Sequence, residues 1–257
     1  MVAALLFTFH LVNVSSMNSS SNKTDFSTLL SYDKAKALLR HLNALNCHGE
    51  KNSSISSITE REENFRIWKN SWEKLSAPKV GSEIDRSFED DERAATTLLI
   101  QLFNTLFSDQ KVILARSTGE PEYFPACNDQ PARIEFAHGF FASALHEISH
   151  WCVAGKTRRT LSDFGYWYAP DGRSATQQQA FERVEIKPQA LECLFTLACG
   201  RPFQVSQDNL FATFDTSTST FADDVYQQAE AYIANPSTLP RDAQVLLCTF
   251  LSICPLD

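Results

Sequence analysis

The chain has 257 residues, of which 43% are hydrophobic and 21% are charged, so it can form one globular domain with a real core plus a smaller module. These values exclude a fibrous protein, a wholly disordered chain and a bundle of membrane helices. Because 31 acidic residues outnumber 23 basic ones, giving a formal net charge of −8, we expect no direct nucleic-acid partner, since binding a phosphate backbone needs a basic face.

Residues 1–14, MVAALLFTFHLVNV, form the apolar stretch that most resembles a targeting signal or membrane insert. They are fewer than the ~20 apolar residues that a spanning helix needs. A secretory signal would open with basic residues, and none precedes Lys23. We therefore interpret this stretch as an over-long gene start and predict a cytoplasmic protein with no membrane partner. The seven cysteines, an odd number without a C-x-x-C pair, fit reduced thiols, mostly in the core.

Two helices are predicted in the N-terminal third of the chain, at Tyr32–Leu45 and Glu60–Leu75. The second helix places large apolar side chains on one stripe, namely Phe65, Trp68, Trp72 and Leu75. We expect this stripe to pack against the main domain rather than to bind a ligand.

A domain boundary is predicted near residue 85. The segment Ala77–Ser87 contains Pro78 and Gly81 and is typical of a linker, and all ten prolines lie at or beyond residue 78. The sequence therefore predicts a Ser-rich, partly helical N-terminal extension over residues 1–84 and a main domain over residues 85–257.

Beyond residue 85, helical and strand periodicities alternate. Helices are predicted at Glu92–Phe107, Gly139–Ala154, Ala175–Val184, Pro188–Cys199, Phe221–Ala234 and Arg241–Ile253. Strands are predicted at Lys111–Arg116 and Ala132–Ala137, and an extended segment at Leu161–Tyr168. This mixture indicates an α+β fold in which a small mixed sheet packs with helices.

The histidines of the main domain all lie in the segment AHGFFASALHEISHW. Within it, residues 146–150 match H-E-x-x-H, a spacing that puts His146 and His150 on one helix face, about one turn apart. The opposite face is apolar and consists of Phe141, Leu145, Ile148 and Cys152. Small residues, Gly139 and Ser143, share the histidine face, so we expect open space above it. The pattern predicts a metal site on a central helix.

A third metal ligand is expected from a carboxylate, because His138 lies about two helical turns from His146 unless Gly139 breaks the helix. The segment FERVEIKPQALE offers Glu182, Glu185 and Glu192. Lys187 precedes a proline and should be extended, which would display Glu185 near the start of the next helix. We choose Glu185 and leave Glu182, Glu192 and His138 as alternatives.

Two histidines and one carboxylate support two chemistries. With Zn(II), Glu147 would act as the general base of a hydrolase, such as a protease or a ribonuclease-like enzyme. With Fe(II), the same ligands leave positions for dioxygen and substrate, as in an oxygenase. A non-catalytic binding module with a structural metal is a third hypothesis, which a closed four-ligand site would favour.

Three runs, FAHGFFASALHEISHWCVAGKTRR, DFGYWYAPDGR and FERVEIKPQALE, resemble the bacterial elongation factor P hydroxylase family over about Glu89–Leu239. The resemblance implies iron-dependent hydroxylation, a monooxygenase-type oxidoreductase reaction, on the β-lysylated lysine of elongation factor P, a post-translational modification in protein biosynthesis. It also implies a mixed α/β fold similar to a metal-dependent ribonuclease. The family's metal histidines match His146 and His150, and its carboxylate matches Glu185.

Further roles are expected around this core. Tyr166 and Tyr168 could line a slot for a long lysyl side chain, with Asp163 or Asp171 meeting its amino groups; core aromatics and an ordinary turn are the alternative. The basic residues after the metal helix could dock an acidic protein partner, or could be C-terminal charges that the helix dipole favours: Lys156, Arg158 and Arg159.

Overall fold

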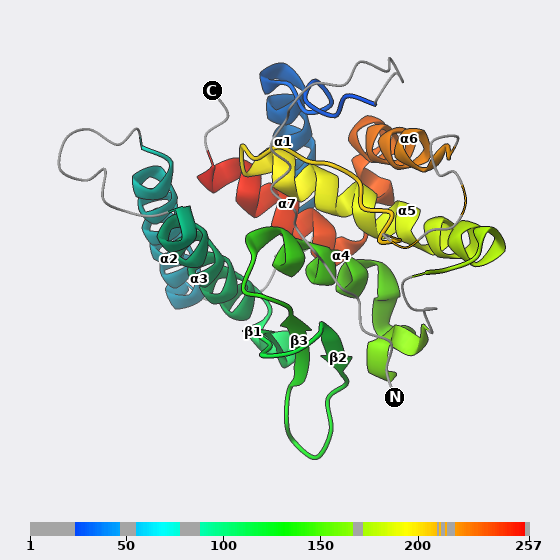
Figure 1. The fold of residues 1–257 in the computed structure, drawn as a ribbon. Helices are drawn as coiled ribbons and strands as arrows, with labels where there is room; N and C mark the ends of the chain where they lie inside the picture. The colour runs from blue at the N-terminus through cyan, green and yellow to red at the C-terminus, as the bar shows by residue number, and fades with distance from the viewer. Residues whose placement is uncertain are drawn as a thin grey trace.

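The structure, a computed structural model, describes residues 24–46, 55–77, 88–166, 172–209, 211, 214 and 219–254. The α-helices are α1 (Tyr32–Asn46), α2 (Ile55–Ser76), α3 (Phe88–Leu106), α4 (Phe141–Arg158), α5 (Ala175–Ala198), α6 (Phe221–Ala234) and α7 (Arg241–Ile253). The strands are β1 (Val112–Arg116), β2 (Glu122–Phe124) and β3 (Ala132–Phe136), and the short 3₁₀ helices are η2 (Ser108–Gln110), η3 (Ser162–Gly165) and η4 (Pro236–Thr238). The predicted α+β class is confirmed (Figure 1).

The three strands form one small mixed sheet in the order β1-β3-β2. β1 and β3 are parallel, with Leu114 opposite Ile134, whereas β2 pairs antiparallel with β3. Side chains of β3 alternate, so that Ala132, Ile134 and Phe136 are buried, as the period of a strand requires. The sequence analysis missed β2, because its three residues between Pro121 and Pro125 are too few to show a period.

Helix α4 lies at the centre, with the sheet on one side and α5 and α7 on the other (Figure 1). Its predicted apolar face is confirmed, because the four side chains of that stripe are all buried: Phe141, Leu145, Ile148 and Cys152. The predicted stop at Gly155 is correct in part. Gly155 leaves helical geometry with φ 65°, which glycine adopts without steric cost, and one more turn then reaches Arg158.

Helix α5 corrects the prediction of two helices separated by an extended Lys187. It runs unbroken from Ala175 to Ala198 and carries Pro188 in its interior. A proline there removes a backbone hydrogen bond, yet buried side chains on both sides of it, among them Phe181 and Leu191, hold the helix against its neighbours. The helix begins with a capping box between Ser174 and Gln177.

The predicted extended segment at Leu161–Tyr168 is wrong over η3. Asp163 and Phe164 adopt left-handed backbone angles, with φ of 48° and 56°. The Phe164 ring stacks on Tyr123 at 4.1 Å between centroids, so packing on β2 decides this turn. Tyr168 lies outside the described residues.

The N-terminal helices pack on the rest of the chain. α1 contacts α7, and α2 contacts α3 and α7. Trp68 and Trp72 are buried, and the Trp72 ring lies 5.8 Å from that of Phe141 at the start of α4. The predicted packing of the aromatic stripe is confirmed, whereas the boundary at residues 84 and 85 stays a prediction, because residues 78–87 lie outside the described part of the chain.

Two further observations bear on the sequence-based expectations. Of the cysteines that the structure describes, Cys152, Cys193, Cys199 and Cys254 are buried, as expected for thiols of the core. Within the described ranges, no helix combines the length and the apolar character needed to cross a membrane.

Candidate metal centre

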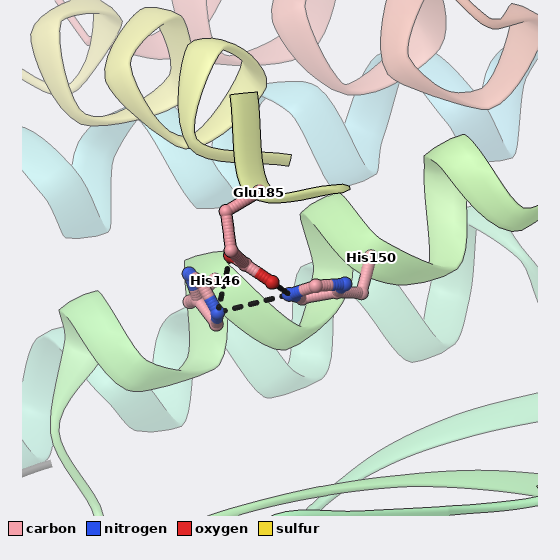
Figure 2. A group of neighbouring side chains, drawn as sticks. All are labelled: His146, His150 and Glu185. Carbon is pink, nitrogen blue, oxygen red and sulfur yellow. Dashed lines mark hydrogen bonds and ion pairs between the residues drawn. The ribbon is translucent and has the colours of Figure 1, made fainter. Parts of the chain in front are cut away.

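The polar faces of α4 and α5 meet in a buried cluster of His146, His150 and Glu185, the three residues predicted as metal ligands (Figure 2). The Nε2 atoms of the two histidines lie 3.0 Å apart. The Glu185 carboxylate extends from α5 toward both rings, with Oε1 3.3 Å from His150 Nε2 and Oε2 3.7 Å from His146 Nε2. His146 and Glu185 are each 1% exposed and His150 is 8% exposed.

The spacing of these donor atoms fits a single metal ion. Ligand atoms bound about 2.1 Å from one ion lie roughly 3.0 to 3.4 Å apart at octahedral or tetrahedral angles. The observed separations of 3.0, 3.3 and 3.7 Å are close to these values. Two imidazole nitrogens and a carboxylate suit Fe(II) or Zn(II). Among the residues that the structure describes, no other group of His, Cys, Asp or Glu gathers in this way.

His146 is held between two carboxylates. Its Nδ1 donates a hydrogen bond to Glu192 Oε2 at 2.8 Å, while its Nε2 faces Glu185 and His150. Burial alone would lower the pKa of His146. The Glu192 hydrogen bond and the charges of Glu192, Glu185 and Glu147 outweigh burial and raise the pKa to about 10. The surroundings of this ring therefore favour a cation strongly.

Glu185 has the complementary electrostatics. Burial would raise its pKa, but the charge and hydrogen bond of His150, with smaller contributions from His146 and Gln189, lower it to about 2. The Gln189 amide lies 3.5 Å from Glu185 Oε2 and also binds the backbone of Ser206 in both directions, at 2.8 and 2.9 Å. Glu185 is therefore an ionised carboxylate in a buried, fixed position.

Two of the alternative third ligands, Glu182 and His138, lie elsewhere, whereas the third, Glu192, contacts His146 through Nδ1. Glu182 accepts hydrogen bonds from Gln178, Gln207 and Ser219 at the N-terminal end of α5. His138 is exposed and precedes α4. Among the described residues, neither belongs to the metal-ligating cluster, and no fourth protein ligand joins the three.

The expected open space above the histidine face is not observed. Ser143, His146 and His150 are all buried, because α5 packs over this face of α4 and supplies Glu185 to it. The small side chains allow the two helices to approach closely, and the histidines meet a carboxylate rather than solvent.

Glu147, the central glutamate of the motif, is half-buried on α4. Burial raises the pKa of its carboxyl, and the charges of Glu185 and Asp163 raise it further, against the opposing charges of His146 and His150. Its proposed role as a general base stays a prediction.

The predicted substrate residues lie beyond the C-terminal end of α4. Asp163 Oδ1 accepts a hydrogen bond from the backbone N–H of Tyr123 at 3.0 Å and so ties η3 to β2. The Tyr166 ring is covered by the Arg158 guanidinium at 3.7 Å. Tyr168 and Asp171 lie outside the described residues.

The three basic residues predicted to dock a partner differ in their surroundings. Lys156 is exposed and Arg158 is partly exposed. Arg159 is engaged inside the fold, where its guanidinium pairs with Asp242 at 2.6 Å and lies 3.5 Å from the centre of the Trp151 ring. These contacts of Arg159 support a role in joining α4 to α7, whereas the docking role of Lys156 and Arg158 stays a prediction.

No role was predicted for Gln189, and Glu192 was considered only as an alternative metal ligand, although both side chains lie beside the cluster. Together with Glu185 they recur at i, i+4 and i+7, which is the spacing of one helix face. That spacing could have identified them, had the helix been predicted to continue through Pro188.

Comparison with known proteins agrees with this geometry. The family model for elongation factor P hydroxylase matches residues 102–253, a range that contains all three clustered ligands. The chain is also similar to the elongation factor P lysine hydroxylase of Haemophilus influenzae, with 46% identity over 150 residues that cover 58% of this chain and 83% of the relative. The resemblance inferred from the motifs is confirmed, and the chain therefore belongs to the elongation factor P hydroxylase family.

Proposed function

We propose that this protein hydroxylates the β-lysylated lysine of elongation factor P, in the cytoplasm, at an iron(II) ion held by His146, His150 and Glu185. The observation that carries the proposal is the buried two-histidine, one-carboxylate cluster in a chain of this family. Bound iron would supply the activation of dioxygen, the co-substrate, since three protein ligands leave coordination positions free.

The protein's own residues would orient and shield this centre. Helices α4 and α5 bury the three ligands, which keeps bulk water away from them and strengthens their electrostatic interactions. The Gln189 amide, fixed on the Ser206 backbone, restrains the Glu185 carboxylate. The reaction also needs access for a long side chain and an external two-electron reductant, since one atom of dioxygen enters the substrate and the other is reduced to water.

Negative charge beside α4 supports recognition of the substrate's ammonium groups. The pKa of Glu122 is raised by burial and by the charges of Asp163 and Glu135, against the opposing charge of Arg133, and the charge of Asp163 also acts on Glu147. These carboxylates therefore lie close enough to create a shared negative potential. We propose that Asp163 and Tyr166, with Tyr168 and Asp171, contact the lysyl side chain, and that Lys156 and Arg158 contact the surface of elongation factor P.

The direct test uses the full chain, loaded with iron(II) anaerobically and then given oxygen, an external two-electron reductant such as ascorbate, and β-lysylated elongation factor P. We expect mass spectrometry to show one added oxygen atom on the modified lysine. Unmodified factor should react poorly, because groups that meet the extra amines would stay unpaired. Zinc-loaded protein should add no oxygen, because zinc has no redox chemistry.

A variant at Glu147 separates this proposal from a zinc hydrolase. In a hydrolase, Glu147→Gln removes the general base and should lower the rate by several orders of magnitude. In a hydroxylase, we expect only a modest loss at unchanged metal content. Absence of oxygen addition, together with cleavage of peptides or RNA by the zinc-loaded protein, would establish the hydrolase instead.

A further inference from the structure

Glu192 lies next to the cluster of His146, His150 and Glu185 but is not one of the three proposed ligands. It lies seven residues beyond Glu185 on α5, so the two side chains share one face of the helix, about two turns apart. Glu185 faces the two Nε2 atoms, whereas Glu192 Oε2 accepts the hydrogen bond of His146 Nδ1 at 2.8 Å. One helix therefore contacts both nitrogens of the same imidazole.

The two nitrogens of a histidine cannot both be metal ligands in this arrangement. A carboxylate only accepts, so the Glu192 contact requires a hydrogen on Nδ1 of His146. In a neutral ring, this leaves the lone pair on Nε2, the atom that lies 3.0 Å from His150 Nε2 and 3.7 Å from Glu185 Oε2. The hydrogen bond thus selects the tautomer that can bind a metal.

The same contact fixes the direction of the ring. The His146 side chain is 2% exposed and that of Glu192 is 12% exposed, so water competes little for the bond. A hydrogen bond that involves a charged acceptor is roughly twice as strong as a neutral one. Since ligating histidines commonly depend on such a partner, its loss lowers metal affinity even when every ligand remains.

We propose that Glu192 is a positioning residue of the metal centre, which holds His146 in the tautomer and orientation that direct Nε2 to the ion. This inference rests on the proposed function only through the metal site itself. The alternative is an ordinary ion pair between α4 and α5 that stabilises the fold and has no effect on the metal.

The test is metal binding by the full chain carrying Glu192→Gln or Glu192→Ala. Affinity for Fe(II) and Co(II) is measured by competition with a chromophoric chelator, and the visible spectrum of the Co(II) form reports on the ligand field. We expect affinity to fall by about 10-fold for Glu192→Gln, whose amide oxygen still accepts a weaker bond, and by up to about 100-fold for Glu192→Ala. The Co(II) spectrum should change in the same order.

The matched control is Glu182→Gln, the same substitution on the same helix. Glu182 also accepts internal hydrogen bonds, but these come from Gln178, Gln207 and Ser219 rather than from a histidine. We expect metal affinity and the Co(II) spectrum of this variant to equal those of the wild type. Circular dichroism confirms folding, and the isosteric Glu192→Gln keeps the test decisive should the alanine variant fail to fold.

The outcomes separate the two hypotheses. Wild-type affinity and spectrum in folded Glu192→Gln would overturn the positioning role while leaving the proposed function intact. The same holds for an equal loss in Glu192→Gln and Glu182→Gln, which would indicate a merely structural effect. Failure of the wild type to bind either ion would overturn both the metal site and the role of Glu192.

Discussion

Two neighbouring carboxylates of α5, one turn apart, have different surroundings. Glu182 is satisfied by two amides and a hydroxyl, all of them neutral donors. Glu185, three residues further along the helix, faces two imidazole rings whose Nε2 atoms lie 3.0 Å from each other. Neutral donors of the protein therefore satisfy the Glu182 carboxylate, whereas the Glu185 carboxylate lies where a cation is favoured.

This difference shows that a carboxylate with internal hydrogen bonds does not by itself mark a metal site. The Glu182 network lies beside Arg173, whose buried guanidinium binds Gln178 at 2.9 Å and fixes the 207–209 segment over the helix. Such a closed network stabilises a fold. The cluster at Glu185 instead brings together three side chains whose donor atoms could hold one metal ion.

Removing a histidine of the cluster should have the largest effect on metal binding. In His150→Ala, one of three ligands is lost, so we expect stoichiometric iron binding and hydroxylation both to disappear while the protein stays folded. Metal content by mass spectrometry and oxygen addition to elongation factor P are the measurements. The control is His138→Asn, which removes an exposed imidazole at a residue with φ 56° that asparagine tolerates, and should keep wild-type metal content.

Neutralising the Glu185 carboxylate should have the second largest effect on metal binding. Glu185→Gln keeps the shape of the side chain but removes the only anionic ligand, and we expect metal affinity to fall by at least about 100-fold, more than second-sphere substitutions usually cost. Equilibrium dialysis against iron(II) or cobalt(II) measures the change. Retention of wild-type affinity would show that the ion is held elsewhere and would remove the contrast between Glu182 and Glu185.

The pH dependence sharpens the same comparison. With its pKa raised to about 10, His146 holds a proton at neutral pH in chelator-treated protein, and an ion must displace it. We expect release of about one proton per ion at pH 7 and an affinity that rises with pH. Calorimetry in buffers of different ionisation enthalpy measures the proton count, and a count near zero would contradict the raised pKa.

The pH dependence of the stability of chelator-treated protein follows from the pKa shifts of His146 and Glu185. The pKa of His146 in the folded protein lies above its usual 6.5. Its contribution to the free energy of unfolding is therefore fully present below pH 6.5 and is lost as the pH rises through about 10. The pKa of Glu185 in the folded protein lies below its usual 4.5, so its contribution to the free energy of unfolding is present above pH 4.5 and is lost as the pH falls through about 2. Denaturant unfolding should therefore show both stabilising contributions together between pH 4.5 and 6.5.

The smallest effect is expected at Glu182. Glu182→Gln weakens three hydrogen bonds from neutral donors and should lower the free energy of unfolding by about 1 kcal/mol. Metal affinity should not change. Urea unfolding checks the first expectation, and a loss of metal binding would mean that Glu182 and Glu185 act as one site.

Local patterns accounted for much of the fold. The predicted bounds of α6 and α7 agree with the structure residue for residue, because their apolar periodicity and their flanking breakers are local features. By contrast, the continuity of α5 through Pro188 was missed, since proline opposes a helix locally and only packing against α4, α6 and α7 reverses that preference. The turn at η3 was missed for the same kind of reason, because Phe164 packs on Tyr123.

The sequence by itself determined that His146 and His150 lie side by side, because an i, i+4 pair on a helix is brought together by the helix alone. It did not separate Glu182, Glu185 and Glu192, which lie within about 80° of one another around α5 at 3.6 residues per turn. Only the packing of α5 against α4 separates them. His146 contacts Glu192 and His150 contacts Glu185, so the two helices run antiparallel at this contact. A third ligand from another helix depends on how two helices pack, and a one-dimensional pattern does not contain that relation.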